Sequence, residues 1–258
     1  MSTRMAPIGE HLRSWRQRRR MSQMDLALDA EISTRHLSYL ETGRAMPSRA
    51  MVLRLAEQLD VPLRERNLWL VAAGFAPAYP ERSLDDPAMR PARAAMEAVL
   101  AAHAPNPALA VDRHWNLVAA NASVSALIAG VDASLLAPPL NVLRLVLHPK
   151  GLAPRILDLA SLKEHLLARL ARQAMISGDP ALAALLRELR DFPAPPGHPE
   201  DPEALALSFR IRVGNAVLSF LTTTMVFGTA HEVALSELTV ETFFPMDDAT
   251  RDALRRLG

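Results

Sequence analysis

The sequence predicts two domains, an all-helical N-terminal domain of five helices and a C-terminal α+β domain with an antiparallel sheet. In residues 1–74, apolar side chains recur at the spacing of short amphipathic helices. Residues 75–91 contain four prolines and no helical period, so a linker is expected at 75–90. Near the end of the expected second domain, 91–258, apolar and polar residues alternate as in half-buried strands.

The composition excludes several classes of protein. Half of the 258 residues are apolar, which is enough for a hydrophobic core and excludes disorder as the dominant state. Cysteine is absent, so disulfides, thiolate catalysis and cysteine-based zinc sites are excluded. No run approaches the roughly 18 to 20 apolar residues of a membrane span, and the N-terminus has no apolar signal region. We therefore expect a soluble cytoplasmic protein with no membrane partner.

The charge is unevenly distributed along the chain. Residues 1–74 contain 12 arginines and 8 acidic residues, whereas the remainder contains 17 basic and 20 acidic residues. A basic N-terminal part favours a polyanionic partner. The alternative explanation is compositional, because nearly all basic residues are Arg and a biased genome produces that pattern too.

The N-terminal helices have clear boundary signals. Ile8, Leu12 and Trp15 fall on one helical face. Ser22 begins the next helix in a capping-box pattern with Asp25.

A third helix follows after a very short turn. Ser33 is a suitable N-cap for it, Leu37 and Leu40 face inward, and Gly43 lies just past its end. Pro47–Ser48 begins the fourth helix, and the fifth ends at about Ala73.

Two short helices joined by a tight turn are the arrangement that enters a DNA major groove. The second helix then presents its outward face to base edges, and an Arg there can bind guanine through two hydrogen bonds. Arginines near helix ends are suited to phosphate contacts. The alternative is a helical bundle with no role in DNA binding. The candidate DNA-binding residues are Gln23, Ser33, Thr34, Arg35, Ser38, Tyr39, Arg44 and Arg49.

The stretch SQMDLALDAEISTRHLSYLETGRAMPS resembles the lambda-repressor-like, Cro-type helix-turn-helix family, also called the xenobiotic-response-element type. The resemblance covers about residues 8–73 and implies binding to double-stranded DNA. One departure is Glu31, which stands in the turn where the family usually has Gly. If that position is left-handed, Glu31 costs on the order of 1 kcal/mol.

The C-terminal part begins with a helix at 92–103 and two expected strands, Ala108–Asp112 and Trp115–Ala119. A short helix starts at Asn121, and about 140–192 is mostly helical.

Three further strands are expected near the C-terminus. They are Leu207–Val213, Val217–Phe227 and Val233–Phe243, with a hairpin turn at Gly214–Asn215 between the first two. In the third strand the apolar positions change phase, which suggests a β-bulge near Ser236–Glu237.

The segment ALAVDRHWNLVAANASVSALIAG is similar to the opening of PAS-type sensor domains. With the N-terminal unit in front, nearly the whole chain resembles an MmyB-like transcription regulator, in which a Cro-type unit precedes a PAS-like ligand-binding domain. The resemblance implies a small apolar ligand of the fatty-acid type, held between the sheet and the helices that cross it.

Such a ligand needs an apolar pocket with one polar partner at its mouth. Arg144 is the candidate for the head group because it interrupts the apolar run VLRLVL. The alternative is that the apolar sheet face is ordinary core. The candidate ligand-binding residues are Trp115, Asn121, Arg144, His148, Phe209, Phe220, Met225 and Phe227.

Other chemistries lack support in the sequence. The eight His residues have no zinc-type spacing. The phosphate-binding motifs G-x-x-x-x-G-K-[ST] and G-x-G-x-x-G are both absent. No Ser-nucleophile motif occurs, so we expect no enzyme activity. Ligation of haem by His148 or His165 is a weaker alternative, and we expect no metal and no cofactor.

The leading interpretation is a transcription regulator that binds DNA as a homodimer and senses a small apolar ligand. The alternative is a DNA-binding regulator whose C-terminal domain is a ligand-free dimerisation or protein-interaction module.

Overall fold

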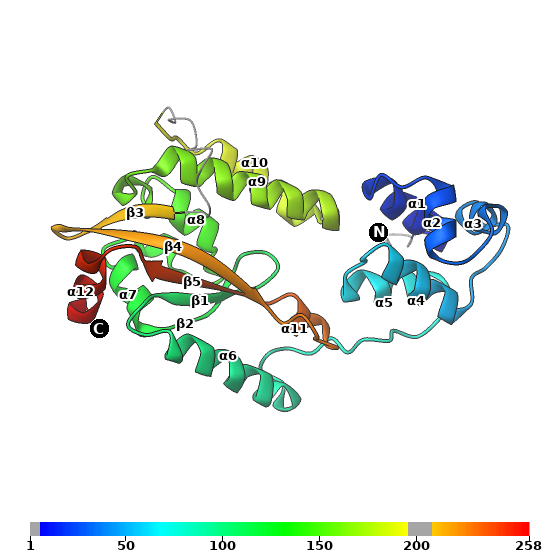
Figure 1. The fold of residues 1–258 in the computed structure, drawn as a ribbon, viewed down its shortest axis with the longest axis horizontal. Helices are drawn as coiled ribbons and strands as arrows, with labels where there is room; N and C mark the ends of the chain where they lie inside the picture. The colour runs from blue at the N-terminus through cyan, green and yellow to red at the C-terminus, as the bar shows by residue number, and fades with distance from the viewer. Residues whose placement is uncertain (1–5, 196–207, 258) are drawn as a thin grey trace. The chain divides into compact units, whose positions relative to one another are not determined.

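The computed structural model describes residues 6–195 and 208–257, which form two compact units. Unit 1 comprises Met1–Arg82 and Thr229–Ser236, and unit 2 comprises Ser83–Gly228 and Glu237–Gly258. Figure 1 shows a group of helices in the first unit and a sheet with helices against it in the second. The predicted all-helical N-terminal domain and α+β C-terminal domain are confirmed.

Unit 1 contains the five predicted helices. They are α1 (Ile8–Arg18), α2 (Gln23–Asp29), α3 (Thr34–Glu41), α4 (Arg49–Gln58) and α5 (Leu63–Ala72). The hydroxyls of Ser22, Ser33 and Ser48 accept backbone N–H bonds at the starts of α2, α3 and α4. The predicted capping box is present, because Asp25 also accepts the N–H of Ser22.

The turn between α2 and α3 is left-handed at Glu31, with φ of 53°. The condition for strain at this position is therefore met, at a cost of about 1 kcal/mol. Gly43, just past α3, also has positive φ, at 71°, which a glycine adopts without strain.

A buried ion pair joins the first three helices. Arg16 on α1 donates to both carboxylate oxygens of Glu41 at the end of α3, at 2.6 and 3.0 Å. Gln23 on α2 donates its amide Nε2 to the same carboxylate at 2.8 Å. Only 2% of the Glu41 side chain is exposed, so its charge depends on these partners rather than on water.

Residues 75–82 lie in unit 1, although the sequence suggests that the linker begins at 75. Asn67 on α5 fixes them: its side-chain oxygen accepts the N–H groups of Ala78 and Tyr79, and its amide donates to the Tyr79 carbonyl. The prolines of this stretch prevent a helix but not a fixed path.

A second, distant segment completes unit 1. The short helix α11 (Val233–Ser236) packs against α5, and Val233 is fully buried. The Val233 N–H donates to the Pro80 carbonyl at 2.9 Å. The carboxylate of Glu232 accepts the N–H of Arg82 at 2.7 Å and that of Leu235 at 2.8 Å.

Unit 2 is built on a five-stranded antiparallel sheet with strand order β2-β1-β5-β4-β3. The strands are β1 (Ala108–Val111), β2 (Leu117–Ala120), β3 (Ser208–Val213), β4 (Ala216–Val226) and β5 (Thr239–Pro245). The predicted turn between β3 and β4 is confirmed, with Gly214 at φ of 57°. Leu207, expected to begin that hairpin, lies outside the described residues.

Helices pack on both faces of this sheet. They are α6 (Arg90–Ala102), α7 (Ala122–Ile128), α8 (Val142–Leu147), α9 (Leu159–Ser177), α10 (Pro180–Arg190) and α12 (Asp248–Leu257), with 3₁₀ turns at Pro87–Met89, Ala133–Leu135 and Ala153–Arg155. In Figure 1, α9 and α10 lie on one side of the strands and α6 on the other. Alternation along β5 agrees: Glu241 bonds Arg169 of α9, whereas the Phe244 ring contacts His103 at the end of α6.

The expected strand Val233–Phe243 is wrong in its first half. Residues Val233–Ser236 form α11, and β5 starts only at Thr239. The carboxylate of Glu232 accepts the Leu235 N–H and so favours a helical turn at this point. The change of phase in the apolar pattern therefore marks a helix-to-strand junction and not a β-bulge.

The charge of Glu41 predicts a pH-dependent stability. Burial raises the pKa of Glu41, but the hydrogen bonds from Arg16 and Gln23, together with the positive charges of Arg16 and Arg13, hold that pKa below its ordinary value of 4.5. Glu41→Gln is expected to lower the free energy of unfolding by about 2 kcal/mol at pH 7, because Arg16 loses its buried counter-charge. A group with a lowered folded-state pKa stabilises fully above its unfolded pKa and loses this effect as the pH falls through the folded value. The deficit of the variant should therefore shrink below pH 4.5.

Urea unfolding of the full chain at a series of pH values, followed by circular dichroism, measures this difference. Glu57→Gln, at an exposed position of α4, is the matched control and should cause little change at any pH. A Glu41→Gln deficit that is absent at pH 7, or that grows as the pH falls, contradicts the account.

Candidate DNA interface and ligand cavity

Helix α3 presents a polar outer face. Leu37 and Leu40 are buried in the core of unit 1, whereas Thr34 and Arg35 are exposed and Ser38 is half-buried. This division follows from the 3.6-residue period, which places both leucines on one side of the helix. The outer face is free of large apolar groups and is suited to a groove lined by polar base edges.

An arginine–tyrosine–arginine cluster extends this face. Arg35 donates its Nε to the Tyr39 hydroxyl at 2.9 Å, and its guanidinium carbon lies 5.4 Å from the Tyr39 ring centre. The guanidinium carbon of Arg44, just beyond α3, lies 5.9 Å from the same ring centre. The tyrosine therefore holds two cations near one end of the helix, where phosphates or guanines can meet them.

The remaining candidate DNA residues differ in how available they are. Gln23 is half-buried and donates to Glu41, so its amide contributes to the joint between α2 and α3. Ser33 is exposed and its hydroxyl caps α3. Arg49 is the exposed first residue of α4.

Unit 2 contains an apolar cavity of about 110 Å³ between the sheet and α7, α8 and α9. Strands β1 and β2, the loop that joins them, strands β3, β4 and β5, and the segments before α8 and around the 3₁₀ turn Ala153–Arg155 contribute the remaining wall. The lining residues include Leu109, Leu117, Val124, Ile128, Leu143, Leu162, Leu166, Phe209, Ile211 and Phe243. Among the described lining residues, Arg169 and Glu241 are the two that carry a charge.

These two charges form an ion pair in the cavity wall. Arg169 on α9 donates its Nη2 to Glu241 of β5 at 2.7 Å. The other Glu241 oxygen accepts the Thr224 hydroxyl at 3.1 Å. The guanidinium carbon of Arg169 also lies 4.6 Å from the centre of the Trp115 ring, a distance typical of a cation–π contact.

Trp115 is held in an uncommon conformation. Its φ is 67°, which for a bulky residue costs about 1 to 3 kcal/mol and persists only when its surroundings fix it. The indole Nε1 donates to Gln173 of α9 at 2.8 Å.

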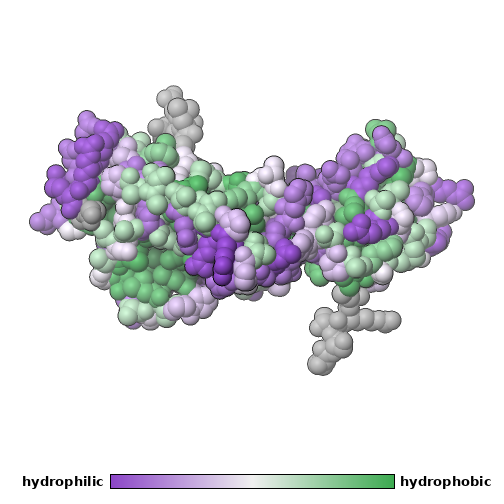
Figure 2. Space-filling view, turned by 90° about the horizontal axis from the view of Figure 1, so that it is seen from below, coloured by the Kyte–Doolittle hydropathy of each residue, from purple (hydrophilic) through white to green (hydrophobic). Residues whose placement is uncertain are grey.

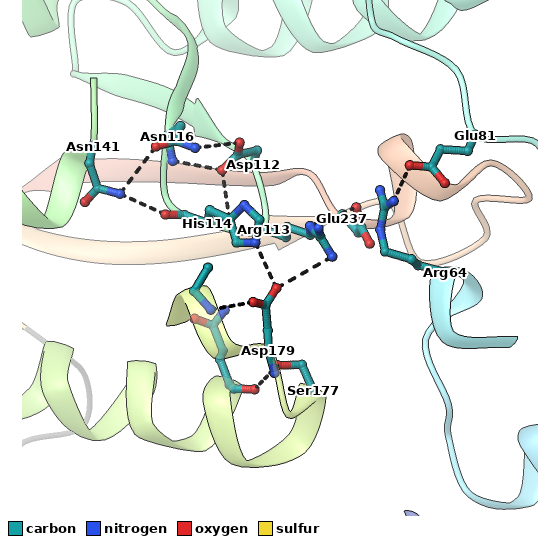
Figure 3. Close-up of polar contacts among 12 residues, drawn as sticks. Arg64, Glu81, Asp112, Arg113, His114, Asn116, Asn141, Ser177, Asp179 and Glu237 are labelled. Carbon is teal, nitrogen blue, oxygen red and sulfur yellow. Dashed lines mark hydrogen bonds and ion pairs between the residues drawn. The ribbon is translucent and has the colours of Figure 1, made fainter. Parts of the chain in front are cut away.

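Polar contacts fix the loop that carries Trp115, as Figure 3 shows. The Asp112 carboxylate accepts the backbone N–H groups of His114 and Asn116, both at 2.8 Å. His114 Nε2 lies 2.8 Å from an oxygen of Asp179, which precedes α10. Arg113 approaches Asp179 at 3.7 Å and Glu237 at 3.9 Å.

Two of the eight candidate ligand residues, Trp115 and Phe209, line the cavity. Phe220 lies fully buried beneath Phe209, with ring centres 5.6 Å apart. Met225 is 42% exposed, and Phe227 lies past the end of β4, so neither is among the described lining residues.

The three polar candidates lie outside the described lining as well. Arg144, expected at the mouth of the pocket, instead makes two hydrogen bonds to Glu188 of α10, at 2.6 and 2.7 Å. The Asn121 side chain bonds three backbone groups near β1. His148 accepts the N–H of Lys150 and packs edge-on against Phe192. Because each of these side chains is paired elsewhere in the fold, none of the three lines the cavity.

The polar wall residues Arg169, Glu241 and Thr222 were missed from the sequence. Arg169 follows Leu162 and Leu166 at helical spacing and so lies on the same face of α9, which is a signal that was present. Thr239, Glu241 and Phe243 lie on one face of β5, but nothing in the sequence near a buried acid in a strand indicates which residue pairs with it.

Within residues 6–195 and 208–257, no group of three or more His, Asp or Glu is placed to hold a metal ion. No helix of that part of the chain is long and apolar enough to cross a membrane.

Comparison with known proteins supports both halves of this picture. A helix-turn-helix domain family matches residues 7–69. The HTH-type transcriptional regulator RghRB of Bacillus subtilis (strain 168), described as uncharacterized, is 38% identical over 78 residues. That match covers 30% of this chain and 54% of RghRB, so it spans about half of the relative's length.

The second family match covers the larger part of the chain. It is described as the MmyB-like transcription regulator ligand binding domain and spans residues 92–257, which include the whole wall of the cavity. The chain therefore carries a helix-turn-helix domain followed by the ligand-binding domain of this family. The chain belongs to the MmyB-like transcription regulators.

Proposed function

We propose that this regulator binds double-stranded DNA as a cytoplasmic homodimer and that a small fatty-acid-like molecule in the cavity of unit 2 changes this binding. Residues 1–74 would carry DNA recognition and 91–258 a PAS-like ligand-binding and dimerisation domain, with 75–90 joining them. The DNA-binding residues are those on and around α3, with Arg35 as the principal base reader.

The observation that carries the ligand proposal is the cavity itself. An apolar cavity left empty costs about 24 cal/mol per Å³, or roughly 2 to 3 kcal/mol for about 110 Å³. A ligand that fills it recovers contacts that an empty cavity lacks. The charged pair in the wall supplies a polar partner for a head group, as binding sites for small molecules generally do. These features favour a sensor over a ligand-free dimerisation module.

The chain path supports communication between ligand and DNA. Strands β4 and β5 contribute Thr222, Glu241 and Phe243 to the cavity wall. The residues that connect these strands, Thr229–Ser236, belong to unit 1. A ligand that favours one arrangement of β4 and β5 therefore acts on a segment that packs in the DNA-binding unit, and it shifts the population of DNA-competent molecules.

Dimerisation is supported by the size of one DNA-binding unit and by exposed apolar surface. A single helix in the groove offers limited contact, and dimers of such units bind half-sites about 34 to 36 Å apart. Figure 2 shows hydrophobic surface between hydrophilic regions on one face of the protein. Exposed apolar side chains of unit 2 include Val217, Val226 and Phe244.

Extraction of the purified protein with denaturing organic solvent, followed by mass spectrometry, tests the ligand proposal. A fatty-acid-like molecule should be released in stoichiometric amount. Ile128→Trp, which fills the cavity from α7, should release much less, whereas Ile176→Trp, at an exposed position of α9, should release the wild-type amount. Release of no small molecule from the wild type would favour the ligand-free dimerisation module.

Arg35→Ala is expected to relax discrimination at one base position by about 1 to 3 kcal/mol, because one bidentate contact to a base is lost. Affinity for unrelated DNA should largely persist. The measurement compares binding to a site selected from a random DNA pool with binding to its single-base variants.

Arg49→Ala is the matched control for this experiment. As a phosphate contact it should weaken binding to all sequences alike and reduce the salt dependence. If Arg35→Ala also weakens binding to all sequences equally, Arg35 is not a base reader.

A further inference from the structure

The cavity wall contains its own counter-charge. Arg169 and Glu241 both line the cavity and are paired at 2.7 Å. The Glu241 side chain is 9% exposed and the Arg169 side chain 23% exposed. The polar wall of the site is therefore a neutral pair rather than a free cation.

A charged head group meets one like charge at this position. A carboxylate that approaches Arg169 also approaches the carboxylate of Glu241, and two buried carboxylates at one site repel each other. An ammonium group meets Arg169 in the same way. Either ion also loses its hydration shell on entering an apolar cavity. This desolvation costs free energy unless the ion pairs with an unpaired opposite charge in the cavity.

An uncharged polar head group meets no such conflict. A hydroxyl donates to a carboxylate oxygen of Glu241 and accepts from a guanidinium N–H of Arg169, so both of its functions are matched. A primary amide does the same with its N–H and its carbonyl. Neither requires the Arg169–Glu241 pair to separate.

We infer that the cavity selects an apolar molecule with an uncharged hydrogen-bonding head group, such as an alcohol or amide, over the corresponding carboxylate or amine. The inference rests on the proposed function, because it names the head-group chemistry of the same site. Of the proposed fatty-acid-like ligand, the inference keeps the apolar chain and replaces the carboxylate with an uncharged head group.

The size of the cavity guides the choice of probe. At about 110 Å³ it is smaller than the engineered cavity of about 150 Å³ that binds benzene. The probes are therefore short-chain compounds with no more non-hydrogen atoms than benzene. 1-Butanol, butanamide, butanoate and butylammonium share a four-carbon chain and differ only in the head group.

The test is isothermal titration of the full-length protein, stripped of any bound molecule, with these four compounds at pH 7. Butanoate and butylammonium are then charged, and the other two are neutral. We expect 1-butanol and butanamide to bind at least about tenfold more tightly than either ion, since each ion is desolvated beside a like charge. This ranking is measured on the wild type and needs no variant.

A charge variant gives the converse result. Glu241→Gln leaves Arg169 without its counter-charge, and butanoate should then bind at least about tenfold more tightly than it binds the wild type. Glu188→Gln is the matched control, because it breaks the pair with Arg144 outside the described lining. It should leave the ranking of the four compounds unchanged.

The outcomes separate the two proposals. Butanoate binding to the wild type as tightly as 1-butanol overturns the neutral-head-group inference and leaves the sensor proposal standing. If none of the four compounds binds and solvent extraction releases no ligand, the sensor proposal fails and the inference fails with it.

Discussion

The connection between β4 and β5 is the constraint on which the rest of the structure depends. Both strands belong to the sheet that walls the cavity, yet the residues between them, Thr229–Ser236, complete the helical unit. Val233 is fully buried in unit 1. The Glu232 carboxylate accepts the backbone N–H of Arg82, the last residue of the first segment of unit 1, and that of Leu235 in the second segment. The chain therefore contributes two segments to unit 1, and the second segment begins and ends in the sheet of unit 2. In the proposed regulation, a ligand that favours one arrangement of β4 and β5 acts on unit 1 through this segment.

Each unit contains a buried or partly buried ion pair that joins elements far apart in the sequence. In unit 1, Arg16 and Glu41 join α1 to α3, and Gln23 adds α2. In unit 2, Arg169 and Glu241 join α9 to β5. Pairs of this kind contribute little net stability compared with apolar packing, but breaking one partner is costly. Their effect is to fix which surfaces meet: the first pair sets the position of α3 relative to α1 and α2, and the second gives the cavity its charged wall residues.

Local signals explain how much of this structure is predictable from the sequence. The caps at Ser22, Ser33 and Ser48 act within a few residues, so the helices of unit 1 and the outward face of α3 follow directly from the chain. The hairpin at Gly214 is local for the same reason. The polar wall of the cavity is different, because Arg169 and Glu241 are 72 residues apart and neither position indicates its partner.

Arg144 shows why residue type alone misleads. It interrupts an apolar run, which suggests a head-group partner, but it is half-buried on α8 and pairs with Glu188. Arg169 has a weaker local signal and lines the cavity. The helix α11 was missed for a similar reason, since the burial of Val233 depends on α5 and Pro80, which lie far away in sequence.

The most direct test of the account is the affinity for a DNA site, selected from a random pool, with and without saturating ligand. Full-length wild-type protein should show a change of at least about fivefold, the lower end of typical allosteric coupling. Glu232→Ala, which removes the carboxylate that anchors Thr229–Ser236 in unit 1, should still bind both DNA and ligand but lose most of this change. Equal DNA affinity of the wild type with and without ligand would contradict the claim that the cavity regulates DNA binding.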